Sequence, residues 1–283
     1  MARRGSSTHK IMLLFLVPFC IWVVAFLILP AAGMFISSFQ NEGGQGFTLD
    51  QYSKVLTHPL YQTAIVNSVL LSLISSVIAI IIAVFGAYSF TTFSNKTRDG
   101  MLNVSNVMTN FAGIPLAFAF MVIWGSNGMF TLIFKKIGLS FLTFDLYSWT
   151  GLGLVYIYFQ VPLAIMLIYP SMYAIRTEWK EAASLLGAGT WQFWRRIGIP
   201  VLLPGIVGTL SVLFANAMGA YATAYALVLR NFNLLPIQIG SLVSGDVFPR
   251  QELGSAMATI LFIILLIAML INEKMLKLAR KGN

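Results

Sequence analysis

The sequence predicts an all-α membrane protein with six transmembrane helices. Hydrophobic residues make up 58% of the 283-residue chain and charged residues only 10%, whereas about a quarter of the residues in a soluble domain are charged. Several apolar runs exceed the roughly 20 residues that an α-helix needs to cross a bilayer. The basic residues, which give a net charge of +9, gather beside the ends of these runs. This placement is typical of membrane topology signals.

The first three predicted spans cover residues of about 11–37, 63–90 and 101–124. The first follows a short basic tail and is too long for a cleaved signal peptide, so we expect a retained helix. The second span carries no charged residue. Near the middle of the third lie Gly113 and Pro115. A proline there frees a backbone carbonyl, which protein or a cavity must satisfy.

The other three predicted spans cover about 149–175, 201–229 and 255–271. Pro162 and Pro170 predict kinks in the fourth span. A polar loop, residues 176–200, joins the fourth span to the fifth. We expect residues 1–283 to form a single transmembrane domain.

The loops on the two sides of this predicted bundle differ in charge. Thirteen of the 18 lysine and arginine residues lie in the two termini, the 91–100 turn and the 176–200 loop. The other three loops hold the remaining five. Lysine and arginine are enriched on the cytoplasmic side of membrane proteins. We therefore expect both termini and the 176–200 loop to be cytoplasmic.

The pattern of the 176–200 loop predicts two short helices joined at glycine. Thr177 and Thr190 can cap them, and Gly187 and Gly189 can end the first helix because glycine adopts left-handed backbone conformations easily. Pro200 closes the second helix. One face of the first helix carries apolar residues at helical spacing, namely Trp179, Ala182, Ala183 and Leu186.

Residues at a fixed spacing in this loop indicate a family. They are Glu181, Ala182 and Ala183, then Gly187, Ile197 and Pro200. The spacing resembles the EAA loop of binding-protein-dependent ABC importer permeases, whose pattern is EAA, three residues, G, nine residues and I-x-L-P. Ile199 stands where leucine is usual. The resemblance implies that the loop is a coupling helix that docks on an ATPase subunit. It also implies a type I importer (MetI-like) fold.

Among these permeases, the chain resembles the spermidine/putrescine-type branch, to which its FTLDQYSKVL segment (residues 47–56) is similar. The resemblance implies uptake of a solute delivered by an extracytoplasmic binding protein, most simply a polyamine. Ferric iron, phosphonate, thiamine or sulfate are alternative cargoes, and a non-transporting scaffold or sensor that binds an ATPase is an alternative role. The implied partners are two ATPase subunits and a second, homologous but non-identical permease, all at the bacterial inner membrane.

Catalytic and phosphate-binding motifs are missing from the sequence. It contains no HExxH zinc motif, no GxxxxGK[ST] phosphate loop and no paired acids within the predicted spans. Cys20 stands alone in an apolar run, so no thiolate metal site is expected. We expect no cofactor on this chain, and the resemblance implies that ATP and Mg²⁺ are held by the partner ATPase. The WQFWRR stretch (residues 191–196) is typical of an interfacial anchor, and we expect no nucleic-acid partner.

Polar residues among small ones single out part of the fifth span. Small residues permit close helix approach, while polar side chains in lipid need partners or water. These side chains are candidates for lining a translocation pathway, and hydrogen bonding between packed helices explains them equally well. The candidates are Asn216, Tyr221, Thr223 and Tyr225, with Asn67 of the second span.

Overall fold

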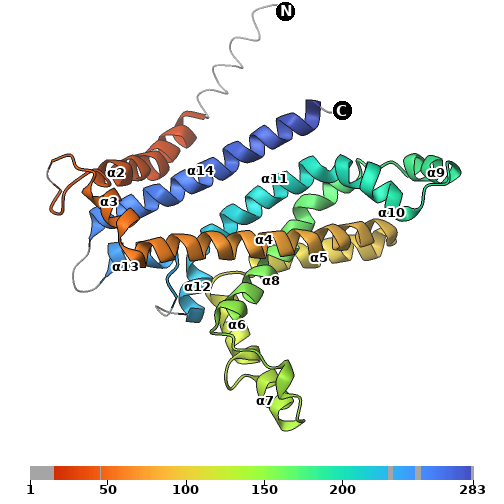
Figure 1. The fold of residues 1–283 in the computed structure, drawn as a ribbon, viewed down its shortest axis with the longest axis horizontal. Coiled ribbons are helices and arrows are strands. Elements are labelled where there is room, and N and C mark those ends of the chain that lie inside the picture. The colour runs from red at the N-terminus through yellow and green to blue at the C-terminus, as the bar shows by residue number, and fades with distance from the viewer. Residues whose placement is uncertain (1–15, 45, 229–231, 246–249, 282–283) are drawn as a thin grey trace, which may run out of the picture. The chain divides into compact units, whose positions relative to one another are not determined.

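The computed structural model describes residues 16–44, 46–228, 232–245 and 250–281. These residues are helical, apart from connecting segments and an isolated bridge between Gln40 and Phe47. Among them, six helices are long and apolar enough to cross a membrane. They are Leu16–Ser37, Pro59–Thr92, Ile114–Lys136, Trp149–Met172, Thr190–Met218 and Gln251–Lys277. The all-α fold class with six membrane helices is confirmed (Figure 1).

The described residues fall into two compact units. Unit 1 comprises the described residues within Met1–Gln62 and Gln238–Phe262, and unit 2 comprises those within Thr63–Ile237 and Ile263–Asn283. The expectation of a single transmembrane domain for residues 1–283 stays a prediction. Residues 11–15, the start of the expected first span, lie outside the described residues.

Unit 1 holds the first membrane helix, which contains a π-helical turn, η1 (Val24–Ile28), followed by α2 (Leu29–Ser37). A loop leads to α3 (Asp50–Thr57). Ser38 is fully buried beneath this loop, and its hydroxyl lies 2.7 Å from the Tyr52 hydroxyl. At the surface, Lys54 donates a hydrogen bond to Glu42 and holds the pKa of that carboxyl below its usual value. These contacts give the polar loop a defined shape.

Unit 2 is built around α8, the membrane helix with the largest buried share. Helix α8 packs against α5 and α11, and α12 packs against α6. The helices that lie mostly or wholly in this unit are α4 (Pro59–Thr92), α5 (Asn95–Asn110), α6 (Ile114–Trp124), α7 (Met129–Lys136), α8 (Trp149–Met172), α9 (Thr177–Leu185), α10 (Thr190–Phe193), η3 (Trp194–Gly198), α11 (Ile199–Met218) and α12 (Tyr221–Val228). Two further helices, α13 (Leu235–Ser244) and α14 (Gln251–Lys281), run from one unit into the other.

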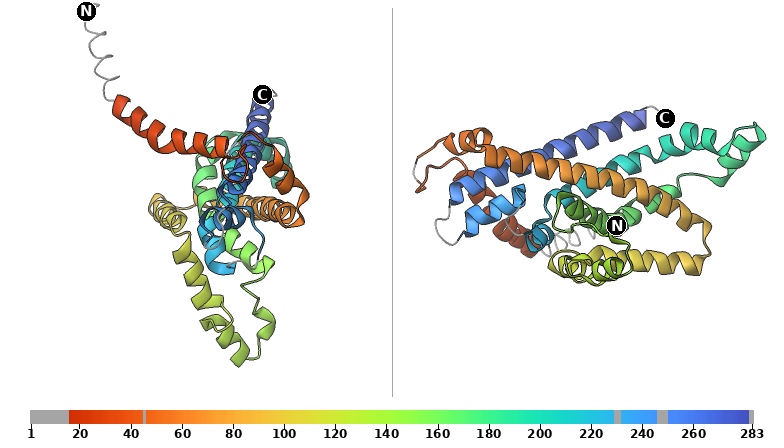
Figure 2. Two further views of the ribbon diagram at one scale, coloured as in Figure 1. Left: turned by 90° about the vertical axis from the view of Figure 1, so that its left-hand side faces the viewer. Right: turned by 60° about the horizontal axis from the view of Figure 1, so that its bottom comes forward.

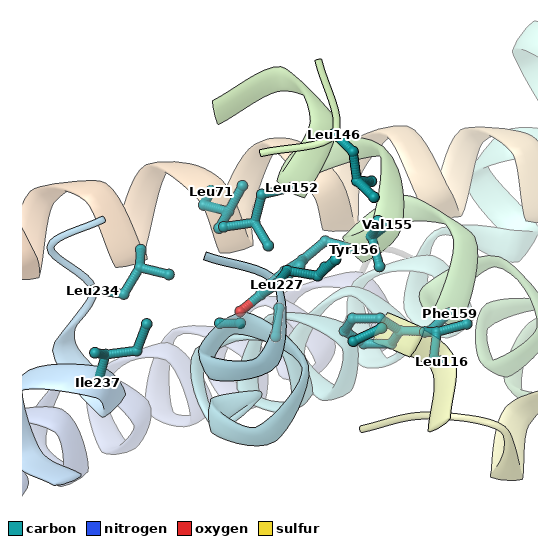
Figure 3. Packing of buried hydrophobic residues seen from close by; sticks show 13 residues of the cluster. Leu71, Leu116, Leu146, Leu152, Val155, Tyr156, Phe159, Leu227, Leu234 and Ile237 are labelled. Carbon is teal, nitrogen blue, oxygen red and sulfur yellow. The ribbon is translucent and has the colours of Figure 1, made fainter. Parts of the chain in front are cut away.

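Two apolar clusters hold unit 2 together. The first centres on Tyr156 and Leu152 of α8, which contact side chains of α4, α6 and α12 (Figure 3). The second joins Ile168 of α8 to Leu202 and Leu213 of α11. In a membrane such contacts stabilise the bundle through close van der Waals packing. The hydrophobic effect does not drive them, because lipid tails are as apolar as the side chains.

A polar contact lies between α4 and α8. The Gln160 side chain is fully buried, and its Nε2 donates to Ser75 Oγ at 2.8 Å. Its Oε1 accepts from Ser76 Oγ, also at 2.8 Å. Every polar atom of the amide end except one N–H therefore has a partner where no water is expected.

The prediction of one continuous span over 101–124 is wrong. The chain leaves the helix after Asn110, Gly113 adopts a φ of +73°, and α6 begins at Ile114. Pro115 lies in the first turn of α6, where its missing N–H breaks no helical bond. The apolar span of this region is Ile114–Lys136, while α5 is amphipathic and packs on α8.

The fifth predicted span, 201–229, is also interrupted. Helix α11 ends at Met218, and α12 begins at Tyr221. The carbonyl of Ala220 accepts a hydrogen bond from the Tyr156 hydroxyl at 3.2 Å, which satisfies a group that the break removes from the helix. The fourth helix ends at Met172, three residues early, and the sixth extends to Lys281.

Candidate functional site

The 176–200 loop folds into α9, α10 and a π-helical turn before α11 begins. These short helices extend beyond the ends of α8 and α11 (Figures 1 and 2). Capping by threonine side chains is not found. Thr177 and Thr190 are the first residues of their helices, and Arg176 and Gly189 take the cap positions without side-chain cap bonds. The predicted first short helix is confirmed as α9, and the predicted capping is wrong. The prediction that Pro200 closes the second helix is also wrong, because the helix that begins at Thr190 continues through the π-helical turn into α11 and ends at Met218. Pro200 lies in the first turn of α11, where its missing N–H is tolerated.

Helix α9 ends in a backbone motif that needs glycine. Gly187 has a φ of +79°, its N–H donates to the carbonyl of Ser184 at 3.0 Å, and the Ala188 N–H donates to Ala183 at 2.9 Å. This pair of bonds is the Schellman motif, which satisfies the last carbonyls of a helix. The prediction that Gly187 ends the helix is confirmed. Gly189 has a φ of −70°, so it does not need to be glycine for its backbone conformation.

The tip of the loop presents apolar side chains to the surroundings. Leu185 is 89% exposed, Leu186 86% and Trp191 74%. Of the predicted apolar face, Ala183 is buried, whereas Trp179, Ala182 and Leu186 are exposed. The apolar side chains at the tip therefore stabilise nothing within the described chain, and such a group is typical of a protein contact surface.

The base of the loop is fixed to the end of α4. The Trp194 ring meets the Tyr88 ring edge to face, with centroids 4.9 Å apart. Gly198 lies against Trp194, where an added Cβ would come within 2.4 Å of the indole. Lys180 of α9 reaches the Tyr88 hydroxyl at 3.5 Å. Tyr88 was not predicted from the sequence, because nothing in its apolar surroundings distinguishes it.

The motif residues all lie on this one continuous segment. Glu181 and Ala182 are exposed on α9, Ile197 is half-buried in the π-helical turn, and Pro200 is exposed in the first turn of α11. Ala183 and Gly187 form the Schellman end of α9. Their predicted role in ATPase coupling stays a prediction.

Two of the pathway candidates make internal hydrogen bonds. Thr223 is buried, and its hydroxyl accepts from the Gly113 N–H at 3.0 Å. Asn67 donates to the carbonyl of Asn233 at 3.2 Å. Tyr221 and Tyr225 stack with centroids 5.3 Å apart and stay about 40% exposed. Asn216 is exposed near the end of α11.

These contacts bring two interrupted helices together. The break before α6 meets α12 through the bond from Gly113 to Thr223, and Tyr156 of α8 bonds to the break before α12. Irregular backbone at membrane depth is found where protein buries it or a cavity receives it.

Comparison with known proteins shows several ABC permeases that are similar along most of the chain, although no family model matches it. The trehalose transport system permease protein SugB of Mycobacterium tuberculosis is 26% identical over 230 residues, which cover 80% of this chain and 78% of SugB. The spermidine/putrescine transport system permease protein PotC of Escherichia coli is 22% identical over 265 residues, covering 92% and 93%.

The fold is shared with a solved transporter. The crystal structure of a bacterial alginate ABC transporter, in complex with an alginate pentasaccharide-bound periplasmic protein, contains a chain that superposes with a TM-score of 0.74. The match covers 97% of this chain and 96% of that one at 17% identity. Along most of its length the chain is similar to permease subunits of ABC transporters, and it shares the fold of an ABC importer permease.

Proposed function

We propose that the 176–200 loop couples this permease to an ATPase chain, through the exposed apolar tip formed by Leu185, Leu186 and Trp191. The exposure of this tip on a fixed base is the observation that carries the proposal. Exposed leucine and tryptophan on a short helix fit an apolar groove, and Glu181 on the same helix is free to pair with a basic group of the partner. The ATPase would hold ATP and Mg²⁺.

The base of the loop supplies a route for motion. Displacement of α9 would act on α4 through Lys180, Tyr88 and Trp194, and on α11 through the π-helical turn. Alternating access requires that the ATPase and the binding protein stabilise different states of the helix bundle. The paired helix breaks at Gly113 and Gly219 are the positions at which the bundle could open, as interrupted helices do in other transporters.

The cargo we propose is a polyamine-type solute delivered by an extracytoplasmic binding protein. The similarity to PotC and the 47–56 segment support this choice. Relatives named for trehalose and alginate show that the fold serves unlike cargoes, and ferric iron, phosphonate, thiamine or sulfate are the alternatives. Asn216, Tyr221, Thr223, Tyr225 and Asn67 are the proposed pathway residues.

The proposed assembly is one copy of this chain, a second homologous permease and two ATPase subunits in the inner membrane. The exposure of the first membrane helix, Leu16–Ser37, supports the presence of a permease partner. In the most apolar stretch of this helix, no residue is buried within this chain. The lysine and arginine asymmetry supports an orientation with both termini and the coupling loop in the cytoplasm.

The coupling proposal predicts that polar substitution of the tip releases the ATPase. The double variant Leu185→Ser, Leu186→Ser should insert at the wild-type level, lose co-purification of the ATPase, and lose ATP-dependent uptake of radiolabelled spermidine in proteoliposomes. In the proposed complex the ATPase would bury both leucines. Losing the contact of one buried leucine costs about 2 kcal/mol of binding free energy, so the affinity for the ATPase should fall at least tenfold.

A matched control is Leu56→Ser, at an exposed leucine of α3 in unit 1, which should keep ATPase binding. Normal co-purification and uptake in the double variant would remove the coupling role from the tip. If the wild-type complex hydrolyses ATP but takes up none of the offered solutes, the result favours the alternative role of a non-transporting scaffold.

A further inference from the structure

A cleft of about 670 Å³ opens in unit 2 beside the beginning of α9. Its walls come from the end of α4, the first turn of α5, the end of α8 and the first turns of α9. The cleft therefore lies where two membrane helices leave their apolar spans and the coupling loop begins. The tip residues Leu185, Leu186 and Trp191 do not line this cleft.

Cationic side chains from separate parts of the chain line this cleft. Arg98 comes from α5, Arg176 from the junction between α8 and α9, and Lys180 from α9. Two carboxylates are near: Glu178 lines the cleft, and Asp99 accepts a hydrogen bond from Arg98 Nε at 3.3 Å. The positive charges outnumber the negative ones, and one arginine edge is already occupied.

Hydroxyl groups complete the lining. The hydroxyls of Tyr169 and Tyr173 lie 2.6 Å apart, and the Tyr88 hydroxyl lies 3.5 Å from Lys180 Nζ. All four of these residues belong to the wall of the cleft. An arginine guanidinium offers a planar fork of donors, and a tyrosine hydroxyl adds a donor from another direction. Met172 and Ile175 supply apolar wall beside these groups.

We propose that this cleft binds the phosphate group of an anionic ligand. A phosphate has several acceptor oxygens, which matches the donors that line the cleft from α4, α5, α8 and α9, and arginine is well suited to it. Basic pockets between membrane helices on the cytoplasmic side are typical sites for anionic lipid head groups. The source of the phosphate is an anionic phospholipid or a free phosphate compound. Bound there, it connects α9 to the ends of α4, α5 and α8.

The test measures binding to the full purified chain in detergent. In the lipid arm, native mass spectrometry counts phosphatidylglycerol retained against phosphatidylcholine. In the second arm, the midpoint of thermal unfolding is followed as inorganic phosphate is added, with chloride at equal ionic strength as reference. Binding to the folded state raises this midpoint, and the rise grows with the ratio of ligand concentration to dissociation constant. Binding does not depend on transport, so this test and the coupling test can fail separately.

The double variant Arg98→Gln, Arg176→Gln keeps most of the side-chain length and removes the two forks. We expect its affinity for phosphatidylglycerol to fall at least about tenfold, because two charge-assisted contacts are lost. The matched control is Arg195→Gln, Arg196→Gln, which removes two exposed charges from the same loop outside the cleft. It should keep wild-type affinity. Glu178→Gln removes a repelling carboxylate and should raise affinity, a result that misfolding cannot produce.

The two sources give different results. Selective retention of phosphatidylglycerol without a response to inorganic phosphate assigns the site to a lipid head group, and a response to inorganic phosphate assigns it to a free phosphate compound. The proposal is overturned if neither probe binds, if the control loses as much affinity as the cleft variant, or if Glu178→Gln weakens binding. Crosslinking of the cleft arginines to an acidic segment of the ATPase, in a chain that binds neither probe, would also overturn it.

Discussion

At the scale of single residues, Gly187 and Gly189 differ although each has open space around it. An added Cβ would meet nothing within 4 Å at either position. Gly187 has a φ of +79°, whereas Gly189 has a φ of −70°. A left-handed conformation costs an L-residue roughly 1 kcal/mol or more, and a right-handed one does not. Only the backbone separates the two positions.

We therefore expect Gly187→Ala to loosen the end of α9. Hydrogen exchange of the amides of Gly187 and Ala188, which close the Schellman motif, should become about fivefold faster for roughly 1 kcal/mol of strain. Gly189→Ala should leave these amides unchanged. Equal exchange rates in the two variants would show that the positive φ contributes nothing to the stability of the turn.

The loop illustrates how far single-residue signals reach. The role of Gly187 as the end of α9 could be predicted because the signal is local. A helix that must end is followed by a residue without a side chain. Tyr88 could not be predicted, because its partners Trp194 and Lys180 are about a hundred positions away in the sequence. The spacing of Trp194 and Gly198 was visible in the sequence, but a glycine four residues after a tryptophan is too common to indicate a contact.

At the scale of helices, the breaks in two predicted spans have the same explanation. Apolar composition alone favours one long span over 101–124 and another over 201–229. Gly113 and Pro115 marked the first break, and Gly219 lies at the second. Each break leaves a backbone group without its helical partner, and a side chain replaces that partner. The Thr223 hydroxyl accepts from the Gly113 N–H, and the Tyr156 hydroxyl donates to the Ala220 carbonyl. Those partners come from other helices, so sequence indicates where the chain can break and only packing decides that it does.

The contact between α4 and α8 leads to a prediction about serine. Ser76 Oγ donates across the interface to Gln160, whereas Ser89 Oγ, further along α4, bonds to Phe85 of its own helix. Hydrogen bonds between membrane helices contribute about 0.6 kcal/mol on average and up to about 1.7 kcal/mol. We expect Ser76→Ala to lie towards the upper part of that range, because the Gln160 amide is fully buried.

The measurement is the free energy of unfolding in mixed detergent micelles. Ser76→Ala should lower it by about 1.5 kcal/mol, and Ser89→Ala should change it by less than about 0.5 kcal/mol. The double variant Ser76→Ala, Gln160→Leu should lose less than the two single variants added together, since the second change removes the unpaired acceptor. Strict additivity would mean that the two side chains do not interact.

At the scale of the whole molecule, charge and packing supply different information. Helix packing defines units 1 and 2 separately, and the spans follow from length and apolarity. Which side each loop occupies depends on lysine and arginine, which contribute almost nothing to packing here: among the described residues, the ion pairs Lys54–Glu42, Arg98–Asp99 and Lys277–Glu273 all involve at least one exposed partner. Orientation is therefore a separate prediction from fold.

Labelling of single cysteines tests that orientation. In a Cys20→Ser background, Asp50→Cys lies in α3 of unit 1 and Thr190→Cys lies at the start of α10, and both positions are exposed. Because thirteen of the 18 basic residues lie on the side of the 176–200 loop, position 50 should react with an impermeant maleimide in intact cells. Position 190 should react only after the membrane is opened. An ATPase can reach the coupling loop only from the cytoplasm, so labelling of position 190 in intact cells would contradict the orientation and the coupling proposal together. Labelling of neither position in intact cells, with both reactive in opened membranes, would contradict the placement of α3 alone.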